Sequence, residues 1–241
     1  VIDAGGDANS TVVNITVPDN GSGNVTVIID NKTYIVTNVT NGSAVVNLTN
    51  MTPGEHNITV IYTDGNGTNS TVTDTFTVRP NDAPIGVTVS DITVGQTAKI
   101  IVEVPSGATG SVEIEINGVS YTAVIEKGKA TFNVDGLKFG VKTVAVRYGG
   151  DAYYAANHTT ANFTVSKNPA AIEISVEGAD VGEAATVTVT DIPGDATGYV
   201  IVSVNGAQYA INLTNGEKSF KVPVLVKGQY NVTATYIGDD K

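Results

Sequence analysis

Asparagine followed two positions later by serine or threonine is the residue pattern with the clearest chemical meaning in this chain. Such a sequon is an acceptor for an N-linked glycan. All 12 asparagines of residues 1–80 lie in sequons, whereas 19 serines and threonines in 80 residues would give 12 × 19/80, or about 3, by chance. The sixteen candidates are Asn9, Asn14, Asn20, Asn24, Asn31, Asn38, Asn41, Asn47, Asn50, Asn57, Asn66, Asn69, Asn157, Asn162, Asn212 and Asn231. We predict that some carry glycans; the alternative is an unmodified polar surface.

Residues for acid–base or nucleophilic catalysis are sparse. The two histidines, His56 and His158, each stand alone, and a nucleophile–base pair or a metal cluster needs partners that converge. We expect both to be exposed or rim residues. Glu103, Glu113 and Glu115 fall at outward positions, where nothing tunes a carboxyl group. No glycine-rich phosphate loop is evident. The sequence therefore predicts no catalytic residue, no metal site and no enzyme activity.

Calcium is the one cofactor that the acidic residues suggest. The linker of residues 81–84, Asn-Asp-Ala-Pro, is similar to that of cadherin-type sandwiches, and Asp151, Asp239 and Asp240 lie in loops. Calcium takes about six to eight oxygen ligands, and the second linker, around Lys167, has no acid nearby. Solvated acidic loops are the better interpretation, so we expect no cofactor.

Two further features could be functional or purely structural. Tyr153 and Tyr154 could stack on a sugar, but alternation along a strand predicts one core and one surface tyrosine. Lys142 occupies an inward position and could form an isopeptide crosslink, which needs a buried lysine beside an asparagine and a carboxyl group. Because Lys142 falls at a strand end, we do not expect this crosslink.

The composition predicts an all-β protein. Hydrophobic residues form 41% of the chain and charged residues 15%, and valine, isoleucine, threonine and tyrosine suit pleated strands. The net charge of −11 without a lysine or arginine cluster argues against binding nucleic acid or anionic lipid. No apolar run approaches the roughly 20 residues that span a bilayer. Cysteine is absent, so the fold cannot depend on disulfides.

Four landmarks recur through the chain and reveal an internal triplication. Each recurs at intervals of 86 to 88 residues: Pro18, Pro105 and Pro193; Tyr34, Tyr121 and Tyr209; Gly54, Gly140 and Gly228; Tyr62, Tyr148 and Tyr236. Such a period is the sequence signature of a tandem array. We predict three repeats, at residues 1–80, 81–167 and 168–241, which are called the first, second and third repeat below.

Apolar and polar residues alternate within each repeat, which predicts strands with one buried face. Two-residue turns, Asp30-Asn31, Asn117-Gly118 and Asn205-Gly206, lie between such segments and predict hairpins. Seven short strands per repeat are typical of a β-sandwich with Greek-key connections. Tyr230, two residues before an inward valine, has the spacing of a tyrosine corner; His56 and Lys142 stand at the equivalent positions.

The ends of the array predict unpaired sheet edges. Compared with residues 85–89, the first repeat lacks most of a first strand, and the third lacks a closing strand of the Phe163 type. Proline in both linkers favours stiff spacers. The expected fold is therefore three tandem immunoglobulin-like β-sandwich domains in an extended rod, and we expect the sequence to be a fragment of a longer chain.

A motif in the second repeat resembles a known family. Residues 148–154, Tyr-Gly-Gly-Asp-Ala-Tyr-Tyr, echoed at 236–240, resemble the Y-x-G-D-x-x-Y motif of bacterial-type immunoglobulin-like repeats. The asparagine- and threonine-rich style is similar to adhesin-like proteins of methanogens. The first repeat departs from the motif, with Tyr-Thr-Asp-Gly at residues 62–65. The resemblance implies a secreted, wall-attached setting and implies no ligand.

The sequence thus predicts a non-catalytic, extracellular stalk of a cell-surface adhesin-like protein. Its expected partners are neighbouring repeats of a longer chain or other copies of itself, together with covalent N-glycans, and neither nucleic acid nor membrane. Two alternatives stay open: a filament subunit assembled by strand donation between chains, and a carbohydrate- or protein-binding module that uses loops at one end of a repeat.

Overall fold

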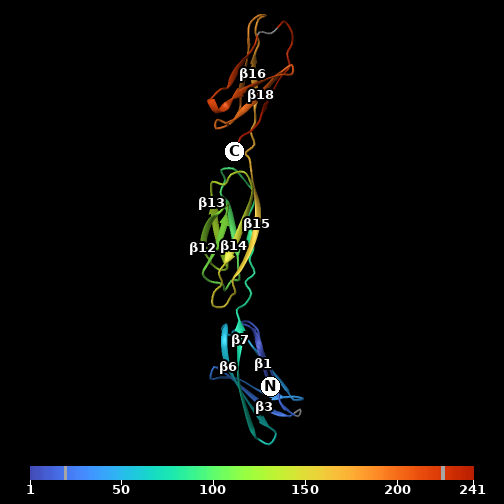
Figure 1. The fold of residues 1–241 in the computed structure, drawn as a ribbon, viewed down its shortest axis with the longest axis vertical. Helices are drawn as coiled ribbons and strands as arrows, with labels where there is room; N and C mark the ends of the chain where they lie inside the picture. Colours follow the sequence, from blue (N-terminus) through green and yellow to red (C-terminus); the bar gives the residue numbers. More distant parts are fainter. Residues whose placement is uncertain (19–20, 224–225) are drawn as a thin grey trace. The chain divides into compact units, whose positions relative to one another are not determined.

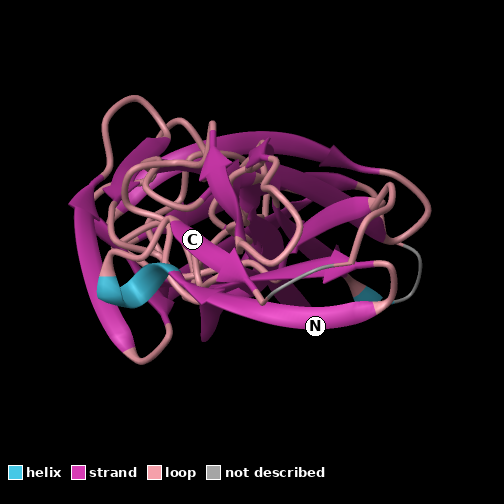
Figure 2. Cartoon of the chain, turned by 90° about the horizontal axis from the view of Figure 1, so that it is seen from above, coloured by secondary structure: helices cyan, strands magenta, loops and turns pink. Residues whose placement is uncertain are grey.

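The protein is all-β, as the sequence predicts. The computed structural model describes residues 1–18, 21–223 and 226–241. Strands and their connecting loops account for nearly all of this part of the chain (Figures 1 and 2). Its longest helical element in those ranges is a short 3₁₀ turn, η2 (Leu213–Asn215). None of its helices in the described ranges is both long and apolar enough to cross a membrane.

The first repeat forms a single seven-stranded sheet in the order β4-β3-β6-β7-β1-β2-β5. The sheet folds over so that inward residues from both of its halves share one core. Its strands are β1 (Ile2–Asp7), β2 (Thr11–Thr16), β3 (Gly23–Ile29), β4 (Lys32–Val39), β5 (Ser43–Leu48), β6 (Gly54–Asp64) and β7 (Asn69–Arg79).

Strand β1 joins the two halves of this sheet. Ile2 to Gly6 pair antiparallel with β2, and Gly6 and Asp7 pair parallel with β7. The expectation that most of the first strand is missing needs correction, because β1 has six residues and pairs on both sides. In the first repeat a single short strand makes both sets of hydrogen bonds, which residues 85–89 do not predict.

The second repeat has two sheets, in the orders β13-β10-β8 and β12-β11-β14-β15-β9. This division of consecutive strands between two sheets is that of an immunoglobulin-like sandwich. The strands are β8 (Gly86–Thr88), β9 (Ile92–Thr93), β10 (Ala98–Glu103), β11 (Ser111–Ile116), β12 (Val119–Val124), β13 (Lys129–Val134), β14 (Gly140–Tyr148) and β15 (Asn157–Ser166).

The third repeat has two three-stranded sheets, β16-β17-β20 and β19-β18-β21. Its strands are β16 (Glu173–Glu177), β17 (Ala185–Thr190), β18 (Tyr199–Val204), β19 (Ala207–Asn212), β20 (Ser219–Val222) and β21 (Val232–Tyr236). Strand β21 pairs with β18 on one side. Within the described residues, no strand lies on its other side, where β7 and β15 lie in the other repeats.

Packing divides the chain into two compact units. One contains residues 1–88, 101–132 and 144–161, and the other contains residues 89–100, 133–143 and 162–241. The division passes through the second repeat, and the boundaries of the three predicted domains stay a prediction.

The alternating apolar residues form the cores, which confirms the strand pattern. Val13, Ile15 and Val17 are buried, as are Val112, Ile114 and Ile116 in β11, and Val200, Val202 and Val204 in β18. The intervening Glu113 and Glu115 are exposed. A side-chain period of two places every second residue on the same face, so these stripes alone determine which face of each strand is buried.

The three hairpin turns are also confirmed. Asn117 and Gly118 have φ of 52° and 78°, and Asn205 and Gly206 have φ of 46° and 92°. Asp30 and Asn31, at 46° and 66°, adopt the same left-handed geometry. Positive φ at both central residues matches the right-handed twist of the flanking strands, and Asn, Asp and Gly tolerate it at low cost.

Candidate functional site

The sequon asparagines lie on the surface. Fifteen of the sixteen fall within the described part of the chain; Asn20 lies outside it. Fourteen of the fifteen are exposed, and Asn212 is half-buried. Those on strands, such as Asn14, Asn24 and Asn47, face away from the core, as the alternation predicts. Their side-chain amides are therefore open to a glycosylating enzyme, although occupancy stays a prediction.

Two sequon side chains already use their Nδ2 in hydrogen bonds. Asn157 Nδ2 donates to the Ala83 carbonyl at 2.7 Å. Asn212 caps η2 by accepting from the Thr214 amide at 3.0 Å, and its Nδ2 lies 3.4 Å from the Tyr199 hydroxyl. A glycan is attached through Nδ2, so these two positions are poorer acceptors in the folded chain than an asparagine whose amide faces only water.

His56 is buried, which corrects the expectation of an exposed or rim residue. Its Nδ1 lies 2.6 Å from Asp30 Oδ2 and its Nε2 lies 2.7 Å from the Thr52 carbonyl. The ring stacks on Phe76 with centroids 5.6 Å apart. Only 6% of the residue is exposed. The parity of the strand places position 56 on the same face as Ile58, and that signal in the sequence was overlooked.

The corner position has the same function in all three repeats, although its residue differs. Tyr230 donates from its hydroxyl to the Val226 carbonyl, four residues upstream, at 2.9 Å, as a tyrosine corner does. His56 contacts the carbonyl four residues upstream. Lys142, also buried, donates to the Phe139 carbonyl at 3.3 Å. Three different donors thus hold the turn before the strand. The hydrogen bond of the corner is therefore present in all three repeats, although only the third repeat has the tyrosine.

Both ring nitrogens of His56 face acceptors, which favours the protonated ring. Burial opposes the charge, but the hydrogen bonds to the Thr52 carbonyl and Asp30 outweigh it and raise the pKa of His56 above 6.5. A neutral ring could donate to only one of these partners. The hydrogen bond from His56 is the main cause that lowers the pKa of Asp30 below 3.8. His56 is buried and the Asp30 side chain is 47% exposed, so the pair is a structural contact at the edge of the core.

Asp151 closes the loop that carries the Tyr-x-Gly-Asp motif. Its Oδ2 accepts from the Thr109 amide and hydroxyl at 2.7 and 2.8 Å, and its Oδ1 accepts from the Tyr153 and Tyr154 amides, both at 2.8 Å. Burial would raise its pKa, but these hydrogen bonds outweigh burial and hold the pKa well below its usual range. We call this arrangement the aspartate clamp.

Asp239 forms the same aspartate clamp in the third repeat. It accepts from the Thr197 amide and hydroxyl at 2.9 and 3.0 Å and from the Lys241 amide at 2.8 Å. Hydrogen bonds from the Thr197 and Lys241 amides lower its pKa to about 2. Both clamp carboxylates are therefore occupied by donors of the protein. In the part of the chain that the structure describes, no group of three or more histidine, aspartate or glutamate side chains is placed to hold a metal.

The remaining candidates are dispersed. Tyr153 is exposed, as predicted for the surface tyrosine, whereas Tyr154 is half-buried and does not belong to the core. Burial and the neighbouring Asp151 raise the pKa of Tyr148 to about 12. Glu103 forms a surface ion pair with Lys129 at 2.8 Å. The corner residues and the clamp residues each hold a loop of their own, and the other predicted candidates lie apart.

Comparison with known proteins gives likeness in fold only. No family model matches the chain, and no curated protein matches it. Among solved structures, titin domains A168–A170 are similar at 13% identity over 98% of this chain and 89% of theirs, with a TM-score of 0.44. A 1.5-MDa bacterial ice-binding adhesin is similar at 22% identity over 92% and 86%, with a TM-score of 0.32. Fibronectin(III)-like modules of Clostridium thermocellum CbhA match at 14% over 69% and 94%, with a TM-score of 0.32.

Proposed function

We propose that this chain is a non-catalytic spacer in the stalk of an extracellular, cell-surface adhesin-like protein, with N-linked glycans on its exposed asparagines. The observation that supports the proposal is that apolar stripes are buried in all three repeats while most sequon asparagines are exposed. The polar residues with perturbed pKa values are committed to corners and clamps, where they hold loops. An array of such sandwiches resists pulling and proteolysis while its flanking segments do the binding.

Binding measurements separate the spacer from a binding module. The purified chain, applied alone to a glycan array and to cells, should give no signal above that of an unrelated β-sandwich protein. A specific signal, lost when the exposed Tyr153 is changed to Ser, would instead assign the chain to the class of binding modules.

Pulling on single molecules tests the mechanical role. Three unfolding events are expected, each releasing roughly 25–30 nm, since about 80 residues extend by about 3.5 Å each. One event, or unfolding at forces no greater than those of a helical protein, would contradict a role as a stalk.

Mass spectrometry of the native protein tests the glycans. Extra mass should be present and should fall when Asn14, Asn24 and Asn47 are changed to Gln. Changing Asn133 to Gln is the matched control, because Asn133 is exposed on β13 but is followed by Val-Asp and is not a sequon. Occupancy should be lowest at Asn157 and Asn212. An unmodified native mass would refute glycosylation and leave the spacer role intact.

A further inference from the structure

The hairpin turn of the first repeat supplies a carboxylate to the corner residue. Asp30 Oδ2 lies 2.6 Å from His56 Nδ1, and Asp30 Oδ1 accepts from the Asn57 amide at 3.1 Å. One turn side chain thus contacts both the corner side chain and the backbone of the residue that follows it. In the first repeat, the buried corner residue therefore faces an acid.

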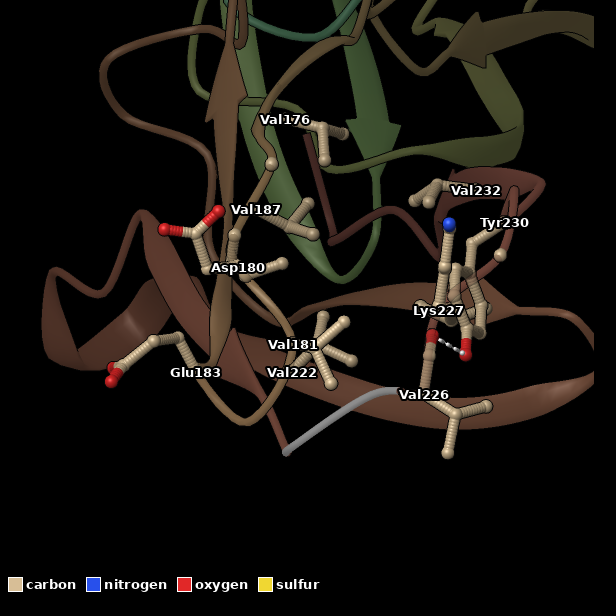
Figure 3. A pocket seen from close by; sticks show the side chains of 15 residues that line it. Val176, Asp180, Val181, Glu183, Val187, Val222, Val226, Lys227, Tyr230 and Val232 are labelled. Carbon is tan, nitrogen blue, oxygen red and sulfur yellow. Dashed lines mark hydrogen bonds between the residues drawn. The ribbon is translucent and has the colours of Figure 1, made fainter.

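The third repeat has an uncharged version of this arrangement. Asn205 occupies the turn position, and its Oδ1 accepts from the Asn231 amide at 2.8 Å. The corner residue is Tyr230, whose hydroxyl donates to the Val226 carbonyl at 2.9 Å, as Figure 3 shows. Because neither the turn residue nor the corner residue is charged, this corner needs no carboxylate.

The second repeat combines a charged corner residue with a neutral turn residue. Lys142 is 8% exposed, and its Nζ donates to the Phe139 carbonyl at 3.3 Å. Among the residues that the structure describes, no acidic side chain forms an ion pair with Lys142. Asn117 stands at the position that Asp30 occupies 87 residues earlier. A buried ammonium group is costly unless it is paired, so this corner lacks the carboxylate that would stabilise it.

Asn117 is held less tightly than the turn residues of the other two repeats. The pairing of β11 with β14 ends at Glu115, whereas the corresponding pairings reach Ile29 and Val204, directly before the turn. Within the described ranges, neither the Asn117 side chain nor the Gly118 amide forms a hydrogen bond. Because Asn117 is exposed and Gly118 has no side chain, the Gly118 nitrogen can approach the side-chain carbonyl carbon of Asn117 without obstruction.

We propose that Asn117 is a deamidation site and that its aspartate product becomes the ionic partner of Lys142. The Gly118 nitrogen attacks Asn117 Cγ and loses its proton, and Nδ2 leaves as ammonia, which closes a five-membered succinimide. Water then cleaves the new N–Cγ bond to give aspartate, or the original main-chain N–C bond to give isoaspartate. The reaction takes up one water and releases one ammonia, without oxidant, enzyme or cofactor. It is independent of the spacer role.

Incubation of the purified 241-residue chain at pH 8.5 and 37 °C tests the reaction. The tryptic peptide of residues 100–127 should gain the mass difference between aspartate and asparagine, and fragmentation should assign the gain to Asn117. Asn205 is the matched control, because it precedes a glycine in the same type of turn while its side chain is held by the Asn231 amide. It should react roughly fivefold more slowly or less, because this hydrogen bond must break before the ring can close.

Substitutions test the pairing with Lys142. Asn117→Asp, which installs the product directly, should raise the thermal midpoint of the second repeat by about 4 °C, as a partly buried ion pair in a domain of this size does. Lys142→Met keeps the length of the corner side chain and removes its charge, so it should abolish the gain. Asn205→Asp, in the corner with the uncharged Tyr230, should give no gain. Amide exchange of β14 reports on the second repeat alone.

Three results would overturn the proposal. The first is reaction at Asn117 no faster than at Asn205. The second is an Asn117→Asp variant that is no more stable than the parent, or whose gain survives Lys142→Met, because the carboxylate would then have another partner or none. The third is a peptide of residues 100–127 joined to one that contains Lys142 with loss of ammonia, because the lysine would then have attacked Cγ directly.

Discussion

At the scale of single residues, the polar groups with unusual environments serve the fold. His56, Lys142 and Tyr230 hold the corner turn through one donor each, and Asp151 and Asp239 hold the clamp loops. Buried polar groups are costly unless they are hydrogen-bonded. Their partners here are local carbonyls and amides, which fix the backbone where strands begin and end.

The His56–Asp30 pair makes the stability of the first repeat depend on pH. The raised pKa of His56 means that its contribution is present below pH 6.5 and is lost as the pH rises through the raised value. The lowered pKa of Asp30 means that its contribution is present above pH 3.8 and is lost as the pH falls through the lowered value. Stability should therefore be greatest between roughly pH 4 and pH 6.5.

A single substitution isolates this dependence. His56→Tyr, which installs the corner residue of the third repeat, should retain the fold and flatten the stability of the first repeat between pH 5.5 and pH 8. His56→Ala should destabilise it at both pH values. Amide exchange of β6 measures the effect locally. An unchanged pH slope in His56→Tyr would assign the titration to another group.

Removal of the clamp carboxylate should destabilise the second repeat. Asp151→Ala leaves the Thr109, Tyr153 and Tyr154 amides without their acceptor, at a cost of about 2 kcal/mol or more in unfolding free energy. Because the pKa of Asp151 is lowered, the carboxylate stays ionised at pH 5 and at pH 8, and the loss should be equal at both. Denaturant titration measures it. The control is Asp82→Ala, an exposed linker acid, for which a comparable loss would argue against the clamp.

At the scale of elements, strands and hairpins could be predicted from sequence, whereas β1 could not. The alternating stripes Val25-Val27-Ile29 and Val112-Ile114-Ile116 predict both that the segment is a strand and which of its faces is buried. Residues 3–6, Asp-Ala-Gly-Gly, offer no such stripe, so the pairing of β1 with both β2 and β7 was not evident. The one sequence feature that marks this pairing is Gly6, the residue at which β1 changes its partner from β2 to β7.

Gly6 is required where β1 changes partner. Its φ is 154°, and a Cβ added there would lie 2.1 Å from the Ser10 carbonyl oxygen. Gly6→Ala should therefore destabilise the first repeat by about 2 kcal/mol, as expected for a residue forced into a sparsely populated backbone region. Gly5→Ala is the matched control, since a Cβ there meets nothing within 4 Å. Thermal unfolding of both variants provides the comparison, and equal losses would contradict this role for Gly6.

At the scale of the whole molecule, the repeats share a pattern but differ in completeness. Val144, Val146 and Tyr148 are at most 2% exposed, whereas the corresponding Val232, Ala234 and Tyr236 are half-buried. The period of Pro18, Pro105 and Pro193 could predict the repetition, and the absence from the third repeat of a segment equivalent to Phe163-Thr164-Val165 could predict the open edge. The pocket lined by Val181, Val187 and Val222 could not be predicted, because residues far apart in the sequence of the third repeat form its walls.

Stability should follow this difference in completeness. Amides of β21 should exchange with solvent faster than those of β6 and β14, because among the described residues β21 pairs with another strand along one side only. Exchange measured by mass spectrometry on the intact chain compares all three strands under identical conditions. Equal protection of β21 and β14 would show that the open edge does not lower the local stability of the third repeat.

The clamp carboxylates have one more consequence. The carboxylate oxygens of Asp151 and Asp239 accept hydrogen bonds from amides and hydroxyls of the same chain, and these bonds hold the ends of the two loops. We therefore expect EDTA to leave the thermal stability of the second and third repeats unchanged. Thermal unfolding with and without the chelator measures this, and a loss of stability in EDTA would contradict closure of these loops by the protein's own donors.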